Sequence, residues 1–118
     1  MRRGALTVVI AAVLTVFAAQ AAWAAVPSTI SIGYNHTSET FHGKVGSSNT
    51  ECVAHRTVKV FKQTPNGPQL QGRTMSDDHG AWKIEVMHAS GHYFAVAAMQ
   101  TVMGTACAKA KSRTVDVM

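Results

Sequence analysis

The chain has 118 residues and a formal net charge of +5; 47% of its residues are hydrophobic and 14% are charged. This is the length of one small domain. The basic residues are scattered along the sequence, which is not the footprint of a nucleic-acid-binding protein, so no nucleic-acid partner is expected.

The first 24 residues have the pattern of an export signal. Two arginines at the start precede an apolar run over 5–19, and an Ala-Trp-Ala sequence then ends at residue 24 with the small residues that a signal peptidase requires. A membrane-spanning helix is the alternative, but the run is short and its end is rich in alanine. We therefore predict a signal peptide over 1–24 and a single secreted or periplasmic β-sandwich domain over 25–118, with no membrane span after the signal is removed.

The composition of residues 25–118 favours an all-β fold. Val, Ile and Thr together number 23 there, against the single leucine Leu70. Branching at Cβ restricts χ1 in a helix and suits a pleated sheet. No window shows a sustained helical repeat of apolar residues with caps, so helices are not expected. Nine Lys and Arg against six Asp and Glu leave this part with a net charge of +3, a mildly basic solvated surface.

Alternation of apolar and polar residues predicts seven to eight strands, the number and spacing of an antiparallel sandwich. The strand over 69–74 has one large apolar residue and is expected at an edge. The strand over 93–99 is apolar on both faces, so we expect it to be central or covered by a partner. In chain order the strands are expected over 30–34, 41–45, 57–61, 69–74, 82–87, 93–99 and 115–117.

Turn residues separate these strands. One turn is Pro65-Asn66-Gly67-Pro68, in which the prolines fix φ and the glycine tolerates positive φ. The other is Asp77-Asp78-His79-Gly80, in which the aspartates hydrogen-bond to the local backbone and the glycine again tolerates positive φ. The 100–110 segment is rich in small residues and is expected to be a long loop. Trp82 and Tyr93 each open or lie in an alternating strand beside a turn, so we predict that both are core anchors.

The two cysteines, Cys52 and Cys107, both follow the expected cleavage site. In an exported protein an even pair indicates a disulfide. A bridge between them closes a loop with a sequence separation of 55 residues, which in the chain-entropy model adds about 4 kcal/mol to the free energy of unfolding. Two free buried thiols are the alternative.

Several of these motifs together resemble a known family. The segments Phe41-x-Gly43-x-Val45, Arg56-x-Val58-x-Val60 after Cys52, an Asp-x-x-Gly turn before Trp82, and Gly91-x-Tyr93-x-Ala95 before Cys107 resemble small secreted bacterial immunoglobulin-like domains. Such domains are similar to the transthyretin-like (carboxypeptidase regulatory-like) module. The resemblance covers roughly 41–117 and implies an immunoglobulin-like sandwich, a Cys52–Cys107 bridge and a structural or binding role. Transthyretin-like hydrolases end in Tyr-Arg-Gly-Ser, which this chain lacks, so their activity is not implied.

No catalytic constellation is apparent, and we predict that the protein is not an enzyme. There is no Gly-x-Ser-x-Gly elbow, and Ser90 is close to His88 and Glu85 in sequence alone. The glutamates that glycoside hydrolysis would require, Glu39, Glu51 and Glu85, have nothing to pair them.

No metal or cofactor is predicted. His88 and His92 have a helical spacing, but Ser90-Gly91 interrupts any helix, so they would flank a turn rather than form a zinc site. Two carboxylates at the 77–80 turn are too few for a calcium loop. Five methionines and six histidines in the mature chain keep copper open as an alternative.

These observations favour binding over catalysis. We predict an exported immunoglobulin-like module that binds a protein or glycan partner, with Phe61 and Phe94 as a possible binding surface, because Val60 and Tyr93 compete with them for the inward direction. The alternative is that the 100–110 loop covers both rings. A periplasmic copper or other metal carrier and a small inhibitor of a secreted enzyme remain rival functions.

Overall fold

A computed structural model describes residues 24–118, and nearly all of the regular secondary structure in these residues is β-strand. The one helical element of the described part is the three-residue 3-10 helix η3 (Thr50–Cys52). The predicted signal peptide lies outside this part, apart from its last residue. The strands are β1 (Ser28–Ile30), β2 (Gly33–Asn35), β3 (Thr40–Ser47), β4 (Thr57–Thr64), β5 (Gly67–Met75), β6 (Ala81–Glu85), β7 (Gly91–Ala97), β8 (Gln100–Val102), β9 (Thr105–Cys107), β10 (Ala110–Lys111) and β11 (Val115–Val117).

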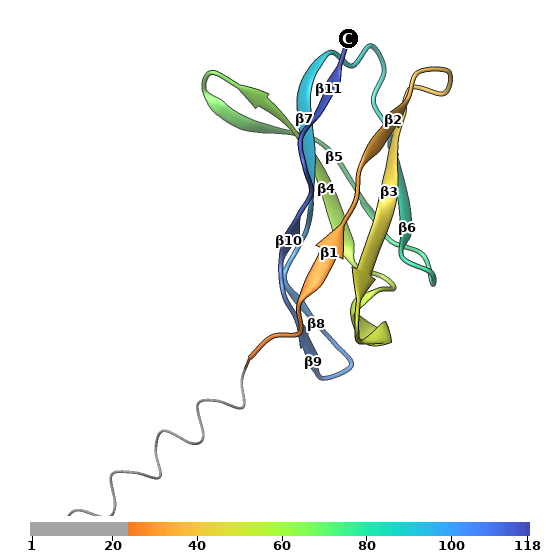
Figure 1. Cartoon of the computed structure of the whole chain (residues 1–118), viewed down its shortest axis with the longest axis vertical. Coiled ribbons are helices and arrows are strands. Elements are labelled where there is room, and N and C mark those ends of the chain that lie inside the picture. The colour runs from red at the N-terminus through yellow and green to blue at the C-terminus, as the bar shows by residue number, and fades with distance from the viewer. Residues whose placement is uncertain (1–23) are drawn as a thin grey trace, which may run out of the picture.

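The strands form two main antiparallel sheets and a small hairpin, which confirms the all-β prediction. In the first sheet, β3 pairs with β1 and β2 along one edge and with β6 along the other. In the second, the order is β10-β7-β4-β5, with β11 also on β7. Strand β7 is therefore central and β5 an edge, as predicted. Figure 1 shows the long strands of both sheets running in the same general direction, with the β8–β9 hairpin at one end.

Side chains from both sheets meet in one hydrophobic core. The rings of Phe41 on β3 and Tyr93 on β7 lie 4.7 Å apart between centroids. Tyr93 keeps 2% of its surface exposed and Trp82 keeps 4%, so both predicted anchors lie in the core. Trp82 lies opposite Gly43, where an added Cβ would approach Cζ2 of the indole to 2.9 Å and a backbone oxygen to 1.9 Å. Glycine at this position therefore allows the close approach of the Ser31 backbone and leaves room for the indole.

Two local predictions are wrong. The strand expected over 30–34 is interrupted at Ser31, whose hydroxyl accepts the Lys44 N–H and so replaces a regular ladder partner. The loop expected over 100–110 holds β8, β9 and the start of β10. Met103 and Gly104 both have positive φ, 49° and 84°, as a two-residue hairpin turn requires. Asn-Gly is the sequence that usually predicts such a turn, and because this chain has Met-Gly instead, the sequence did not indicate a hairpin here.

The predicted disulfide between Cys52 and Cys107 is present, and both cysteines are fully buried. Beside it lies the buried guanidinium of Arg56, which donates to the Ser28 hydroxyl and to the carbonyl oxygens of Cys52, Ala98 and Ala108 at 2.8–2.9 Å. Burial lowers the pKa of Arg56. Because Ala98 and Ala108 flank the β8–β9 hairpin, Arg56 and the disulfide together hold the base of that hairpin in place.

Candidate functional site

The outer face of the second sheet carries a pair of stacked phenylalanines. Phe61 on β4 lies directly opposite Phe94 on β7, and their rings are 5.5 Å apart with 21° between their planes. Val60 and Tyr93 take the inward direction and are buried in the core. Phe94 keeps 5% of its surface exposed, whereas Phe61 is partly buried. Residues 100–107, part of the segment considered as a cover for the two rings, form their own hairpin. The ammonium of Lys111 lies over the Phe94 ring, 4.4 Å from its centroid.

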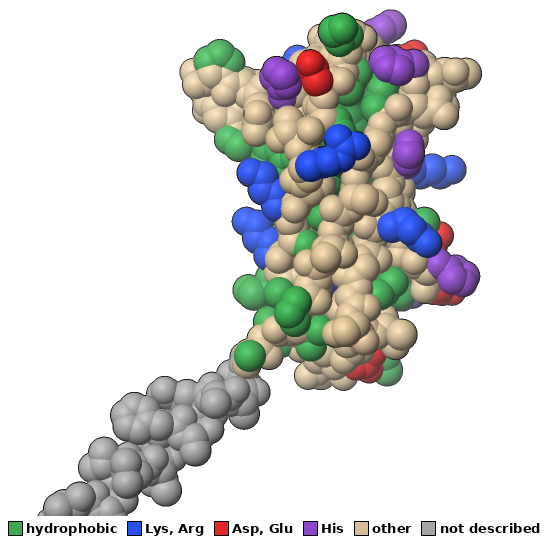
Figure 2. Space-filling model, in the orientation of Figure 1, with side chains coloured by type: hydrophobic (Ala, Val, Ile, Leu, Met, Phe, Trp, Pro, Cys, Tyr) green, Lys and Arg blue, Asp and Glu red, His purple; other side chains and the backbone are tan. Residues whose placement is uncertain are grey.

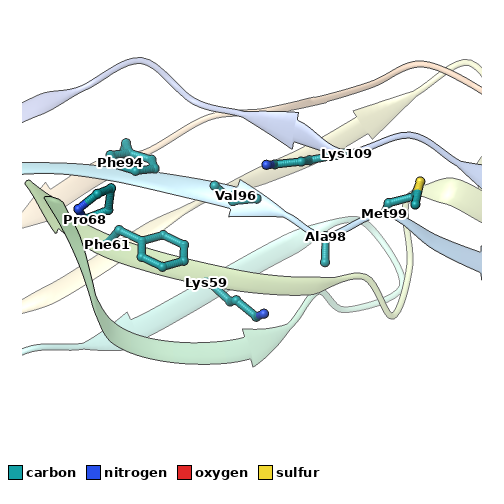
Figure 3. Close-up of a pocket in the computed structure, with 8 residues that line it drawn as sticks. All are labelled: Lys59, Phe61, Pro68, Phe94, Val96, Ala98, Met99 and Lys109. Atoms are coloured by element: carbon teal, nitrogen blue, oxygen red, sulfur yellow. The ribbon is translucent and has the colours of Figure 1, made fainter.

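An open groove of about 410 Å³ lies beside this pair. In Figure 3 the two rings and Pro68 lie toward one end and Met99 toward the other, with Val96 and Ala98 between them. Lys59 and Lys109 lie on opposite sides of Val96 in this view. The residues that line the groove are Lys59, Phe61, Pro68, Phe94, Val96, Ala98, Met99 and Lys109.

Local irregularity in the β4–β5 hairpin shapes one end of the groove. Val60 pairs with Gly72 but Phe61 pairs with Leu70, so the register shifts by one residue between them. Such a bulge bends a hairpin and increases its twist. The turn end of this hairpin projects sideways from the body of the domain in Figure 1, and its Pro68 lines the groove beside the aromatic pair.

Positive charge gathers on this face, although the basic residues are scattered in sequence. Lys59 and Lys109 line the groove, Lys111 covers Phe94, and Arg73 lies opposite Lys59 on the edge strand β5. Among the described residues that line the groove none is acidic. Figure 2 shows Lys and Arg side chains at the left edge of the molecule, beside β10 of Figure 1, with hydrophobic side chains next to them. The face therefore combines an apolar floor with cationic sides.

The sequence predicts that the two phenylalanines face outward, and the structure adds the lysines beside them. The alternation that turns Phe61 outward also turns Lys59 outward, so that lysine had a signal. Lys109 and Lys111 had none, because they reach this face through the pairing of β10 with β7. That pairing joins segments that no local pattern connects.

A second, wider depression of about 790 Å³ lies near β3 and β6 and includes Trp82. The indole N–H of Trp82 is buried without a hydrogen-bond partner among the described residues. Lys44 and Lys83 line this depression together with Asp77. Its lining mixes both signs of charge, so no single ligand chemistry follows from it.

The histidines do not converge. Within residues 24–118, no three His, Cys, Asp or Glu side chains lie together in a way that could hold a metal ion. Two histidines form exposed pairs with aspartates, His55 with Asp78 at 3.2 Å and His92 with Asp116 at 3.8 Å. His88 and His92 flank Gly91, where the chain enters β7. Five methionines are exposed, by 57–90%.

The residues weighed for catalysis have structural contacts. The Ser90 backbone N–H donates to the Tyr93 hydroxyl, which donates in turn to the Ser90 carbonyl oxygen. The Glu39 carboxylate accepts the His88 N–H, and the Glu51 carboxylate accepts the Thr105 hydroxyl.

The carboxylate of Asp77 belongs to the turn before β6. It accepts the backbone N–H groups of His79 and Ala81 at 2.8 and 2.9 Å. These two hydrogen bonds lower the pKa of Asp77 against a smaller opposing effect of desolvation, with further help from His79 and Lys44. Gly80 completes the turn with a φ of 86°.

Across residues 24–118 no helix has both the length and the apolar character needed to cross a membrane. Comparison of the chain with protein-family models, curated proteins and solved structures gives no match. What is established is a small all-β domain with antiparallel sheets and one disulfide, with no family identified.

Proposed function

We propose that this chain is an exported, non-catalytic immunoglobulin-like module that binds a protein or glycan partner through the outer face of its second sheet. The observation that carries this proposal is the groove beside the stacked Phe61–Phe94 pair. Small-molecule pockets are typically concave and mostly apolar, with a few polar groups that orient the ligand, and this groove has the same character, six apolar residues and two lysines.

The strand arrangement supports the immunoglobulin-like part of the proposal. Strands β1 and β2 follow one edge of β3, and β10 and β11 follow one edge of β7. Counting each broken pair as one strand leaves a three-stranded layer and a four-stranded layer around one core. Seven strands in two layers are what an immunoglobulin-like sandwich requires.

Export is supported by the disulfide and by the sequence of the first 24 residues. Disulfides persist in oxidising compartments and are rare in reducing ones. The bridge between Cys52 and Cys107 therefore fits a protein that acts outside the cytoplasm.

The test is capture of a partner by the mature protein, used as immobilised bait in native culture fluid and envelope extract. Two variant baits are compared with the unmodified protein. Phe61→Ala changes the groove, and Glu85→Ala, on the exposed face of β6, is the control. We expect a partner that the unmodified and Glu85→Ala baits retain and the Phe61→Ala bait loses. Equal capture by all three baits would mean that contact is made elsewhere on the domain.

Metal carriage is the rival function, because five methionines are exposed to solvent. Thioethers favour Cu(I) and imidazoles favour Cu(II). Calorimetric titration of the metal-free protein with Cu(I), Cu(II) and Zn(II) under a competing chelator separates the two functions. Stoichiometric, chelator-resistant uptake that His→Ala or Met→Ala changes abolish would favour the carrier, and weak superstoichiometric uptake would favour the binding module. A small enzyme inhibitor, the third function, would reveal itself by the identity of the captured protein.

A further inference from the structure

We infer that the occupant of the groove is an acidic, extended polypeptide segment, with an apolar side chain on the groove floor and carboxylates on either side of it. This inference rests on the proposed function and names the chemistry of its partner.

Charge complementarity is the first argument. Lys59 and Lys109 lie on opposite sides of the apolar residue Val96, so a ligand that fills the groove meets an ammonium group on each side (Figure 3). Arg73 lies beside Lys59 on the neighbouring strand and extends the positive charge toward the sheet edge. The nearest acidic residue that the strand register places on this face is Asp116 on β11, and it already faces His92. A ligand with carboxylates on both sides is therefore favoured over a neutral or cationic one.

The composition of the lining is the second argument, and it separates a polypeptide from a glycan. Of the eight lining residues, the two lysines are the only ones with polar side chains, and the other six are apolar. A sugar brings many hydroxyl groups, and each one that is buried against the groove floor loses water and needs a partner. Two ammonium groups satisfy carboxylates but leave most of those hydroxyls unpaired. A peptide side chain such as leucine or phenylalanine places no such demand on the floor.

The apolar surface at the ends of the groove is the third argument. Leu70, which pairs with Phe61 in the β4–β5 register, is 52% exposed, and Met99 at the other end is 71% exposed. Exposed methionines adapt to varied side chains at protein-binding surfaces. Exposed apolar surface therefore continues from the aromatic end of the groove onto the edge strand β5, where a chain with more than one apolar residue would find a further contact.

The experiment uses a capped synthetic peptide with one leucine between two pairs of glutamates, added to the ¹⁵N-labelled mature protein. Two matched peptides replace the glutamates with glutamine or the leucine with serine. We expect the acidic peptide to shift backbone amide resonances of β4, β7 and β10, and both matched peptides to bind more weakly, the glutamine version by about three- to tenfold. Added salt should weaken the acidic peptide further.

Two protein variants with the same change of charge supply the control. Lys59→Gln/Lys109→Gln removes the cations that line the groove, and Lys44→Gln/Lys83→Gln removes two exposed cations near β3 and β6. All four are surface side chains, so both variants are expected to fold, which thermal unfolding verifies. The first variant should lose three- to tenfold in affinity for the acidic peptide and the second should keep it. Equal losses would overturn the inference, because they would reflect net charge alone.

Two further probes distinguish failure of this inference from failure of the proposed function. They are a uronic-acid polysaccharide and phospholipid vesicles with a fraction of phosphatidylserine. Groove binding by either probe that depends on Phe61, without binding of the peptide, overturns the polypeptide inference and leaves the binding face intact. If none of the probes shifts the groove resonances and Phe61→Ala does not change partner capture, both the inference and the proposed function are overturned.

Discussion

Strands β6 and β7 bury their side chains in different ways, and the difference lies on the face that we propose as the binding surface. In β6, Trp82 and Ile84 are buried while Lys83 and Glu85 are exposed. In β7, the inward residues are buried and so are two of the outward ones, Phe94 and Val96, which keep 5% and 9% of their surface exposed, whereas the outward His92 is exposed. Strand β6 has one apolar face, whereas β7 has two.

The outer face of β7 is not covered by another layer of secondary structure in the described part of the chain. Phe94 is covered by Phe61 from the next strand and by the side chain of Lys111. Side chains that close over an apolar surface in this way can move aside more readily than a packed strand. The apolar run of β7 therefore has two faces to account for: one packs in the core, and the other is the face that we propose binds a partner.

The largest expected effect tests the inner face of β6. Trp82→Ala should lower the free energy of unfolding by about 3–5 kcal/mol, because it leaves a cavity the size of an indole in the core. Lys83→Ala, on the opposite face of the same strand, should cost less than about 0.5 kcal/mol. Urea unfolding followed by circular dichroism measures both. Equal losses at the two positions would show that the register of β6 is wrong.

The next largest effect concerns the disulfide, which helps to hold the base of the β8–β9 hairpin in place. The double variant Cys52→Ser/Cys107→Ser should lose about 2–4 kcal/mol, since the bridge closes a loop with a sequence separation of 55 residues. Because Lys109 follows Cys107 closely, the variant should also lower the affinity of the groove for the acidic peptide. Intact mass of the secreted form, with and without reductant before alkylation, reports the bridge directly. Two thiols alkylated without reductant would contradict it.

Much of the fold follows from local patterns in the sequence. Alternation predicted the regions of β3, β4 and β6, because one face of each strand packs against the core, and a continuous apolar run predicted β7. The turn before β6 was predicted because Asp77 and Gly80 have the hydrogen-bonding and φ preferences that such turns need. The disulfide was predicted from the even number of cysteines together with export.

What the sequence did not predict depends on contacts between distant segments. Arg56 has the same alternation as Val58 and Val60, yet burial of its charge is possible because carbonyl oxygens from three other segments accept its N–H groups. The lysines of the groove come together through the pairing of β10 with β7 and of β7 with β4. Neither arrangement leaves a signal within one stretch of chain.

A smaller effect tests the outer face of β7. Phe61→Ala should cost about 1 kcal/mol of stability, because the ring is partly exposed and loses mainly its stacking on Phe94. The same variant should lose partner binding in the groove, and this loss should be larger than its small loss of stability would explain. Urea unfolding beside Trp82→Ala provides the measurement. A loss as large as that of Trp82→Ala would mean that the outer face is a second core rather than a contact surface.

The smallest effect concerns the turn that precedes β6. The folded-state pKa of Asp77 lies below its unfolded value of about 3.9, chiefly because the N–H groups of His79 and Ala81 hydrogen-bond to the carboxylate. Ionised Asp77 therefore adds stability above that unfolded value, and this stability is lost as the pH falls through the folded-state pKa. Since Ala81 is the first residue of β6, protonation weakens the start of that strand.

Asp77→Asn should remove this part of the acid dependence. We expect the variant to be slightly less stable than the unmodified protein near neutral pH and to approach it below about pH 4. Glu85→Gln, an exposed carboxylate at the other end of β6, is the matched control and should follow the unmodified protein. Urea midpoints between pH 7 and pH 2 give the comparison. The same acid dependence in Asp77→Asn and Glu85→Gln would contradict this prediction. It would mean that the Asp77 carboxylate does not stabilise the start of β6, and that pairing with β3 alone holds this strand in place.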